Sequence, residues 1–239
     1  MKANTSHPGW LASFAALVAL VLTVSASYWQ FARANTKAAL RQQYLARQAM
    51  PPHNLNITVP RADVVSFRKV RITGTYDPEK AILLDNKVRA GVPGYEIVVP
   101  LRLSGTDRYV LINRGWLGLG RNRYDQPAVV VPKGVVTVTG TAIVPGHGAL
   151  ELSDEIVEGR VWQNLDMTRF RDRQGLDIAD FVIQEESEQA DGINREWPAP
   201  GFGIETHQVY AAQWLLFATL IIFFYVYYGF VRRKPNQKQ

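Results

Sequence analysis

The stretch Val209–Val231, VYAAQWLLFATLIIFFYVYYGFV, decides the architecture of this chain. It holds no charged residue and is followed directly by Arg232-Arg233-Lys234. About 20 apolar residues in a helix cross the hydrocarbon core of a bilayer, and a basic cluster is typical of the point where such a segment stops. The sequence therefore predicts a transmembrane helix, which we place at residues 207–231.

A second apolar stretch, WLASFAALVALVLTVSASYWQF, covers Trp10–Phe31. A cleavable signal peptide is the competing interpretation, because Val24-Ser25-Ala26 has the small residues of a cleavage site. However, Lys2 alone charges the segment before it, and the apolar character continues past Ala26 into an aromatic end typical of a membrane–water boundary. We therefore expect an uncleaved transmembrane helix at residues 10–31, after a short tail at 1–9.

The charges that flank the two predicted helices give opposite indications of topology. Arg232-Arg233-Lys234 favours a basic cytoplasmic tail at residues 232–239 under the positive-inside rule. Four basic residues follow the first apolar stretch and favour the reverse orientation: Arg33, Lys37, Arg41 and Arg47. Because long loops are translocated largely regardless of charge, we expect residues 32–206 on the outer side of the membrane.

Residues 32–206 have the pattern of one β-rich domain. A helix is expected over Arg33–Arg47, before Pro51-Pro52. Strand-like runs bounded by turn residues follow at 64–76, 81–88, 95–103, 108–116, 129–144, 160–163 and 181–184. Asp166 and Gly175 suit the N-cap and the stop of a short helix at 167–174. The predicted fold is a membrane protein in which two transmembrane helices flank a mainly antiparallel β (α+β) extramembrane domain, either a sheet or a barrel.

Composition excludes several functions. The chain has no cysteine among its 239 residues, which removes disulfides, thiolate nucleophiles, iron–sulfur clusters and thiolate copper sites. The net charge of +6 hides an asymmetry, because residues 33–133 carry a net +10 and residues 134–208 a net −9. These halves either neutralise each other where they pack or leave a basic surface for anionic lipid or an acidic partner. No recognition motif accompanies the charge, so we expect no nucleic-acid partner.

The histidines are isolated from one another, and His207 differs from the rest by its position at the start of the second apolar helix. No serine has a plausible histidine and acid partner, so we expect a protein that is not an enzyme. On a helix, one face carries His207, Tyr210, Ala211, Trp214 and Ala218. An imidazole there can bind a haem iron axially beside small residues, with Tyr210 and Trp214 stacking on the ring or anchoring the helix. The alternative is an ordinary polar residue at the membrane boundary.

Several motifs resemble those of the surfeit-locus cytochrome c oxidase assembly proteins. The most specific is Val110–Trp116, VLINRGW, which follows Gly91–Leu101, GVPGYEIVVPL. The other matching stretches are Trp29-Gln30 with Arg33 and Lys37, Phe67–Val70 with Gly74–Tyr76, Arg195–Trp197, and His207 with Tyr210, Ala211 and Trp214. The chain departs from the family at Thr206, where members often have asparagine.

The resemblance implies a role in the biogenesis of haem–copper terminal oxidases, at the insertion or stabilisation of haem a in the catalytic subunit. The implied partners are that subunit of cytochrome c oxidase, haem a synthase and the lipid bilayer. The implied location is the bacterial inner membrane with a periplasmic domain, or the mitochondrial inner membrane in a eukaryote. Bacterial members are described as binding haem a through a histidine of the second helix, which corresponds to His207. Haem a would then be bound transiently between the two apolar helices.

Arg114, in the NRGW motif, completes the expected cofactor-binding residues His207, Tyr210 and Trp214. It would pair with a haem propionate or a partner carboxylate. The structural alternative has Gly115 turning the chain after a strand and Trp116 packing in the core. At the level of the whole protein, the alternative function is a membrane-anchored scaffold that docks on the oxidase subunit without binding haem. Copper delivery is disfavoured because cysteine is absent.

Overall fold

The computed structural model describes residues 9–120, 126–145, 157–187 and 189–231. Its chain divides into two compact units, a helical unit that comprises residues up to Gln43 and from Pro200 onward, and a β unit that comprises Tyr44–Ala199. The basic tail expected at 232–239 and nearly all of the tail expected at 1–9 lie outside the described residues.

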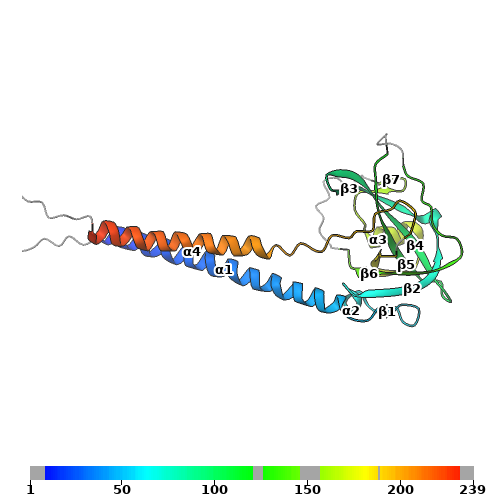
Figure 1. Cartoon of the computed structure of the whole chain (residues 1–239), viewed down its shortest axis with the longest axis horizontal. Helices are drawn as coiled ribbons and strands as arrows, with labels where there is room; N and C mark the ends of the chain where they lie inside the picture. Colours follow the sequence, from blue (N-terminus) through cyan, green and yellow to red (C-terminus); the bar gives the residue numbers. More distant parts are fainter. Residues whose placement is uncertain (1–8, 121–125, 146–156, 188, 232–239) are drawn as a thin grey trace, which may run out of the picture. The chain divides into compact units, whose positions relative to one another are not determined.

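The helical unit contains α4 (Ile204–Val226), its π-helical extension η2 (Tyr227–Val231) and most of α1 (Trp10–Gln48). Figure 1 shows α4 lying alongside α1. Each helix is long and apolar enough to cross a membrane by length and composition. α1 does not end at Phe31 but continues through the helix expected at 33–47, since neither glycine nor proline interrupts residues 10–48.

The contact between α1 and α4 follows a spacing of three and four residues on both helices. On α1 the buried and half-buried residues with this spacing include Ser13, Ala16, Leu20, Thr23, Ser27, Gln30 and Ala34. On α4 they are Ile204, His207, Ala211, Trp214, Ala218, Ile221 and Tyr225. We call these two series the helix seam. A hydrogen bond between Ser13 Oγ and Tyr225 Oη (2.8 Å) and one from Ser27 Oγ to the carbonyl of Ala211 (2.9 Å) join the helices in an antiparallel register, and the spacing is that of coiled-coil-like packing.

The β unit is built on a nine-stranded sheet of the described residues. Its strands are β1 (His53–Asn54), β2 (Lys69–Tyr76), β3 (Ile82–Arg89), β4 (Val92–Leu103), β5 (Tyr109–Gly118), β6 (Val135–Ile143), β7 (Val157–Glu158), β8 (Val161–Trp162) and β9 (Ile178–Glu185). They lie in the order β1-β2-β6-β9-β5-β4-β3-β8-β7. An additional pairing of β2 with β4 closes β2, β6, β9, β5 and β4 into a barrel.

The prediction of a mainly antiparallel domain is wrong, because the sheet is mixed. β1 pairs with β2, β3 with β8, and β5 with β9 in parallel. The chain reaches β9 only after crossing over through α3 (Met167–Gln174), and it enters between β5 and β6 instead of adding to an edge. Alternating apolar residues specify which face of a strand is buried, and they do not specify its direction.

Gly74 allows the barrel to close. It pairs with β6 through Val136 and with β4 through Leu103. A Cβ at this position would lie 2.5 Å from Leu101 Cδ2 and closer still to the carbonyl of Arg102. A side chain here would therefore push β4 away from β2 and open the barrel.

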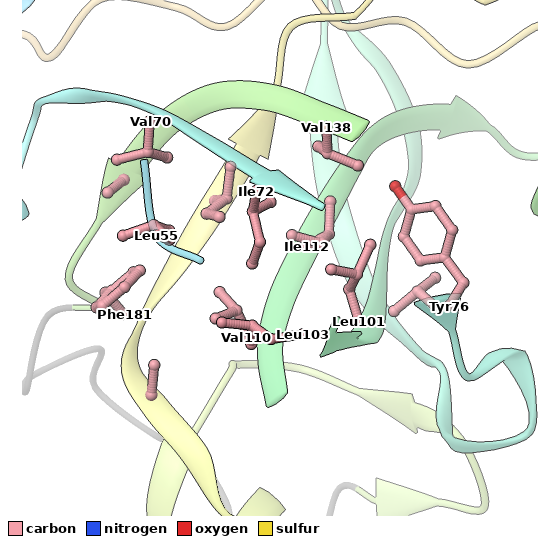
Figure 2. Close-up of a cluster of buried hydrophobic side chains, with 14 of the residues drawn as sticks. Leu55, Val70, Ile72, Tyr76, Leu101, Leu103, Val110, Ile112, Val138 and Phe181 are labelled. Atoms are coloured by element: carbon pink, nitrogen blue, oxygen red, sulfur yellow. The ribbon is translucent and has the colours of Figure 1, made fainter. Parts of the chain in front are cut away.

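Apolar side chains fill the barrel and also cover part of its outside. Figure 2 shows Ile72, Leu101, Val110, Ile112 and Phe181 converging in the interior from four different strands. A second cluster packs outside, where α3 contributes Phe170 against Trp162 and Leu176. Nineteen buried residues form the interior cluster, so the barrel has a packed core.

The short helix at 167–174 is confirmed with its caps. Asp166 Oδ1 accepts hydrogen bonds from the backbone N–H groups of Thr168 (2.8 Å) and Arg169 (3.0 Å), and Gly175 adopts φ 63° at the C-terminus. The expected strand at 64–76 is shorter, because α2 (Ala62–Val65) occupies its beginning. Ala90 and Gly91 form the turn between β3 and β4 and both have positive φ, and β4 starts directly after them at Val92.

Candidate functional site

His207 lies at the first turns of α4, in the helix seam. Its Nδ1 is 2.7 Å from Oε1 of Gln30 on α1, and no other described residue hydrogen-bonds the ring. Because an amide oxygen is only an acceptor, this contact favours the tautomer of a neutral imidazole that carries its proton on Nδ1. Nε2 then carries an unshared lone pair, which is the form that binds a metal ion.

The residues expected beside His207 divide between the seam and the outer surface. Ala211 and Ala218 are buried and Trp214 is half-buried in the seam, whereas Tyr210 is 48% exposed. The small side chains therefore let α1 approach α4, as the hydrogen bond from Ser27 to the Ala211 carbonyl shows. The two helices are therefore in direct contact at Ala211.

The donor set suits a haem iron. Nε2 is the ring nitrogen of His207 that Gln30 does not contact. Exposed Tyr210 lies one turn along α4, and the edge of Trp214 contacts Phe217 with ring centroids 5.8 Å apart. A single neutral histidine nitrogen flanked by aromatic side chains is sufficient for axial ligation of a haem. The described part of the chain has no group of three or more His, Asp or Glu side chains that could hold a bare metal ion.

Arg114, by contrast, is fully buried on β5 in the β unit. Its Nε donates to Glu185 Oε2 (3.3 Å), and its Nη2 donates to Asp191 Oδ2 (2.7 Å) and to Gln189 Oε1 (2.8 Å). Its Nη1 donates to the carbonyl of Val130. All three nitrogens thus meet acceptors of the same chain, which compensates the cost of burying the charge.

Arg195 completes a balanced cluster of two arginines and two carboxylates. It donates through Nη1 and Nη2 to the two oxygens of Asp191 (2.8 and 2.6 Å) and through Nε to Glu185 Oε2 (3.3 Å). We call Arg114, Glu185, Asp191 and Arg195 the arginine cluster. The hydrogen bonds from Arg195 hold the pKa of Asp191 at about 2 and in return raise the pKa of Arg195. Burial, and then the charge of Glu185, raises the pKa of Tyr76, whose ring lies under the Arg114 guanidinium.

The other NRGW residues hold the segment that returns from β9. Trp116 exchanges two backbone hydrogen bonds of 2.8 Å with Asn194. Gly115 is not a turn residue, since β5 continues to Gly118, but it has φ 129° and a Cβ there would lie 2.6 Å from Ile193 Cγ2. Trp116 is half-buried, not in the core, and its Nε1 donates to the carbonyl of Lys87 (2.6 Å). Glycine is therefore required where the returning segment crosses β5.

Two motifs that are far apart in the sequence meet in this network. Trp197 Nε1 donates to the carbonyl of Glu185 (2.8 Å), and the guanidinium of Arg89 lies 5.1 Å from the centre of the Trp197 ring. NRGW and Arg195–Trp197 thus stabilise one junction of the β unit. A polar groove of about 570 Å³ lies beside it, lined by Glu186, Gln189, Ala190, Ile193, Arg195 and Glu196.

The charge asymmetry of the sequence is resolved in part by packing between the halves. Lys69 pairs with Glu186 (3.1 Å), Arg108 with Asp177 (3.6 Å) and Arg114 with Glu185 (3.3 Å). Each pair joins a basic residue of 33–133 to an acidic residue of 134–208, as the first of the two interpretations expects.

The sequence-predicted site residues therefore fall in two places. His207, Tyr210 and Trp214 share α4, whereas every described contact of Arg114 is internal to the β unit. Sequence reasoning missed Gln30 as the partner of His207, although Trp29-Gln30 was already notable. It also missed Glu185 and Asp191 as the partners of Arg114.

Comparison with known proteins supplies the classification. The SURF1 family model matches residues 17–219. A SURF1-like protein of Rickettsia bellii is 24% identical over 231 residues, which cover 88% of each chain. Uncharacterized SURF1-like proteins of Mycobacterium bovis and Mycobacterium tuberculosis are each 29% identical over 140 residues, which cover 56% of this chain and 51% of theirs. With most of its length matched by the family model, this chain belongs to the SURF1 family.

Proposed function

We propose that this chain is a membrane-anchored assembly factor for a haem–copper terminal oxidase, and that it holds haem a through His207 on the way to the catalytic subunit. The observation that carries the proposal is the geometry of His207, whose Nδ1 is bonded to Gln30 at 2.7 Å so that Nε2 keeps its lone pair. Membership of the SURF1 family supports the oxidase-assembly context.

The surface of the helix pair supports membrane anchoring. Large apolar side chains project outward along both helices, among them Leu17, Leu22, Leu215 and Phe223, each more than half exposed. In water so large an apolar surface would favour aggregation, whereas lipid tails solvate it. We propose that both helices span the inner membrane with the β unit on the periplasmic side.

In this proposal the residues of the chain bind haem a and orient it. His207 would hold the iron of haem a through Nε2, and the iron would supply the Lewis acid that accepts this nitrogen. Tyr210, exposed on the outer surface of α4, and Trp214 would contact the macrocycle and orient it. A single histidine bond is readily exchanged, which suits transfer to the oxidase subunit.

Arg114 has a structural role in this proposal. A propionate could reach its guanidinium only by displacing Asp191 or Gln189, which accept from Nη2 at 2.7 and 2.8 Å. The fully buried position leaves no exposed donor for that exchange.

The test is to express the full chain together with the enzymes of haem a synthesis, purify it in detergent and record its absorption spectrum. We expect a haem a spectrum for the wild type and for His53→Ala, a matched control that removes a histidine of β1 in the β unit. We expect its loss in His207→Ala.

Equal pigment in His207→Ala and wild type would disprove the assignment of His207. A colourless wild type that still co-purifies with the oxidase catalytic subunit would replace the haem-binding proposal with the scaffold function.

A further inference from the structure

We infer that Gln30 is the positioning residue of His207: its side-chain carbonyl keeps the imidazole proton on Nδ1 and thereby presents Nε2 to the iron. The inference rests on the proposed function. It adds a second residue to the site, from the other helix and 177 positions away in the sequence.

The helix seam holds the two side chains against each other. Gln30 and His207 occupy facing seam positions, and both are half-buried. One turn further along, Ser27 donates to the carbonyl of Ala211 at 2.9 Å, so α1 and α4 are in direct contact at this level. The amide of Gln30 therefore meets His207 through the ordinary packing of the helices and needs no rearrangement.

The orientation of the amide decides the chemistry. A neutral imidazole carries one proton, on either Nδ1 or Nε2, and the partner of one nitrogen determines the state of the other. With Oε1 of Gln30 at 2.7 Å, the proton lies on Nδ1. Without an acceptor there, the Nε2–H form becomes accessible, and that form cannot bind iron until it loses its proton.

The same hydrogen bond affects the strength of the ligand. Donation from Nδ1–H to an acceptor raises the basicity of the distal nitrogen, and removing such a partner typically costs a metal site about 10- to 100-fold in affinity. A more basic ligand stabilises ferric over ferrous haem, so the acceptor at Nδ1 also lowers the midpoint potential.

Three variants separate this role from simple packing. Gln30→Leu removes the acceptor at similar volume, and Gln30→Glu keeps an acceptor oxygen and strengthens it by charge. Ser27→Ala removes the neighbouring seam hydrogen bond and leaves the Gln30–His207 contact in place, which makes it the matched control.

The first measurement uses the haem-free full chain in detergent, labelled with ¹⁵N-histidine, at a pH where histidine is neutral. The His207 resonances are identified by their loss in His207→Ala. We expect a protonated Nδ1 and an unprotonated Nε2 in the wild type and in Ser27→Ala, and a shift towards Nε2–H in Gln30→Leu. An Nε2–H tautomer in the wild type, or an unchanged tautomer in Gln30→Leu, would overturn the inference.

The second measurement is haem a affinity and midpoint potential in the same variants. We expect Gln30→Leu to lose at least about tenfold in affinity and to shift the potential upward, Gln30→Glu to shift it downward, and Ser27→Ala to match the wild type. Haem binding with equal affinity and potential in the wild type and Gln30→Leu would reject the positioning role and leave the proposed function standing. A wild type that binds no haem a would reject both.

Discussion

The arginine cluster of the β unit and the Gln30–His207 pair of the helical unit are both polar contacts in apolar surroundings, but only the first is saturated. In the cluster, all three nitrogens of Arg114 donate to protein acceptors, and two arginines face two carboxylates. In the pair, one ring nitrogen of His207 is held, and the other meets no hydrogen-bonding partner among the residues described.

This difference separates the family motifs into two kinds. Residues whose hydrogen-bonding groups all meet partners inside the chain, such as Arg114, stabilise the fold. A residue that is held by one hydrogen bond and keeps a second nitrogen without a partner among the described residues, such as His207, is the better candidate for a ligand of the haem iron. Substitutions should therefore separate the two regions, with large effects on unfolding in one and on ligand binding in the other.

The largest effect on stability is expected from Arg114→Leu. It removes one of the two arginines that contact fully buried Glu185, and breaking a buried ion pair costs about 3–5 kcal/mol. Denaturant unfolding of the full chain in detergent, followed by tryptophan fluorescence, measures this loss. A change below about 1 kcal/mol would show that the cluster does not stabilise the barrel, and loss of haem a binding at unchanged stability would then assign Arg114 a role in binding the ligand.

A comparison of two glycines tests whether the NRGW motif stabilises the β unit. Gly115→Ala places a side chain at a φ of 129° and against Ile193 of the returning segment, so we expect the free energy of unfolding to fall by about 2–4 kcal/mol. Gly105→Ala is the matched control, because its φ is 84° with no atom within 4 Å of the added Cβ, and about 1 kcal/mol is expected. Equal losses of unfolding free energy in the two variants would mean that the returning segment does not pack closely against β5 at Gly115.

Features of the fold that depend on local sequence could be predicted, and features that depend on contacts between distant segments could not. The helix at 167–174 was predictable, because Asp166 and Gly175 act through local hydrogen bonds. The apolar runs that became β2 to β6 were predictable from their alternation. The insertion of β9 between β5 and β6, and the closure at Gly74, depend on pairings between distant strands that periodicity does not encode.

The candidate site shows the same limit. His207 was identifiable because a histidine at the end of an apolar helix is conspicuous in the sequence. Gln30 was visible only as part of a motif, since its role depends on the antiparallel register of α1 and α4. Arg114 was ambiguous because its partners Glu185 and Asp191 approach it only when the segment after β9 folds back.

Acid should lower the stability of the β unit, because it protonates Asp191. The pKa of this carboxyl is about 2 in the folded chain and near 3.9 when unfolded, so the unfolded state takes up the proton first as the pH falls. The stabilisation is complete above about pH 5 and is lost as the pH falls towards 2. Unfolding measured from pH 6 to pH 2 should show a steeper decline for the wild type than for Asp191→Asn, and parallel declines would contradict the role of the Arg195–Asp191 contact.

The smallest effect on stability is expected from His207→Ala. It removes one hydrogen bond between neutral groups, worth about 1 kcal/mol, from a half-buried position. Unfolding of the β unit should be unchanged, while haem a binding is lost. If His207→Ala destabilised the chain as much as Arg114→Leu, the histidine would be a structural residue and the contrast between the two regions would disappear.

The most direct test of the account is magnetic coupling between the haem a iron and ¹⁵N-labelled histidine in the purified full chain, measured by pulsed electron paramagnetic resonance. We predict a strongly coupled ¹⁵N nucleus in the wild type and in His53→Ala, and its absence in His207→Ala. A bound haem a without ¹⁵N coupling in the wild type, or with coupling that persists in His207→Ala, would contradict the assignment of His207 as the iron ligand.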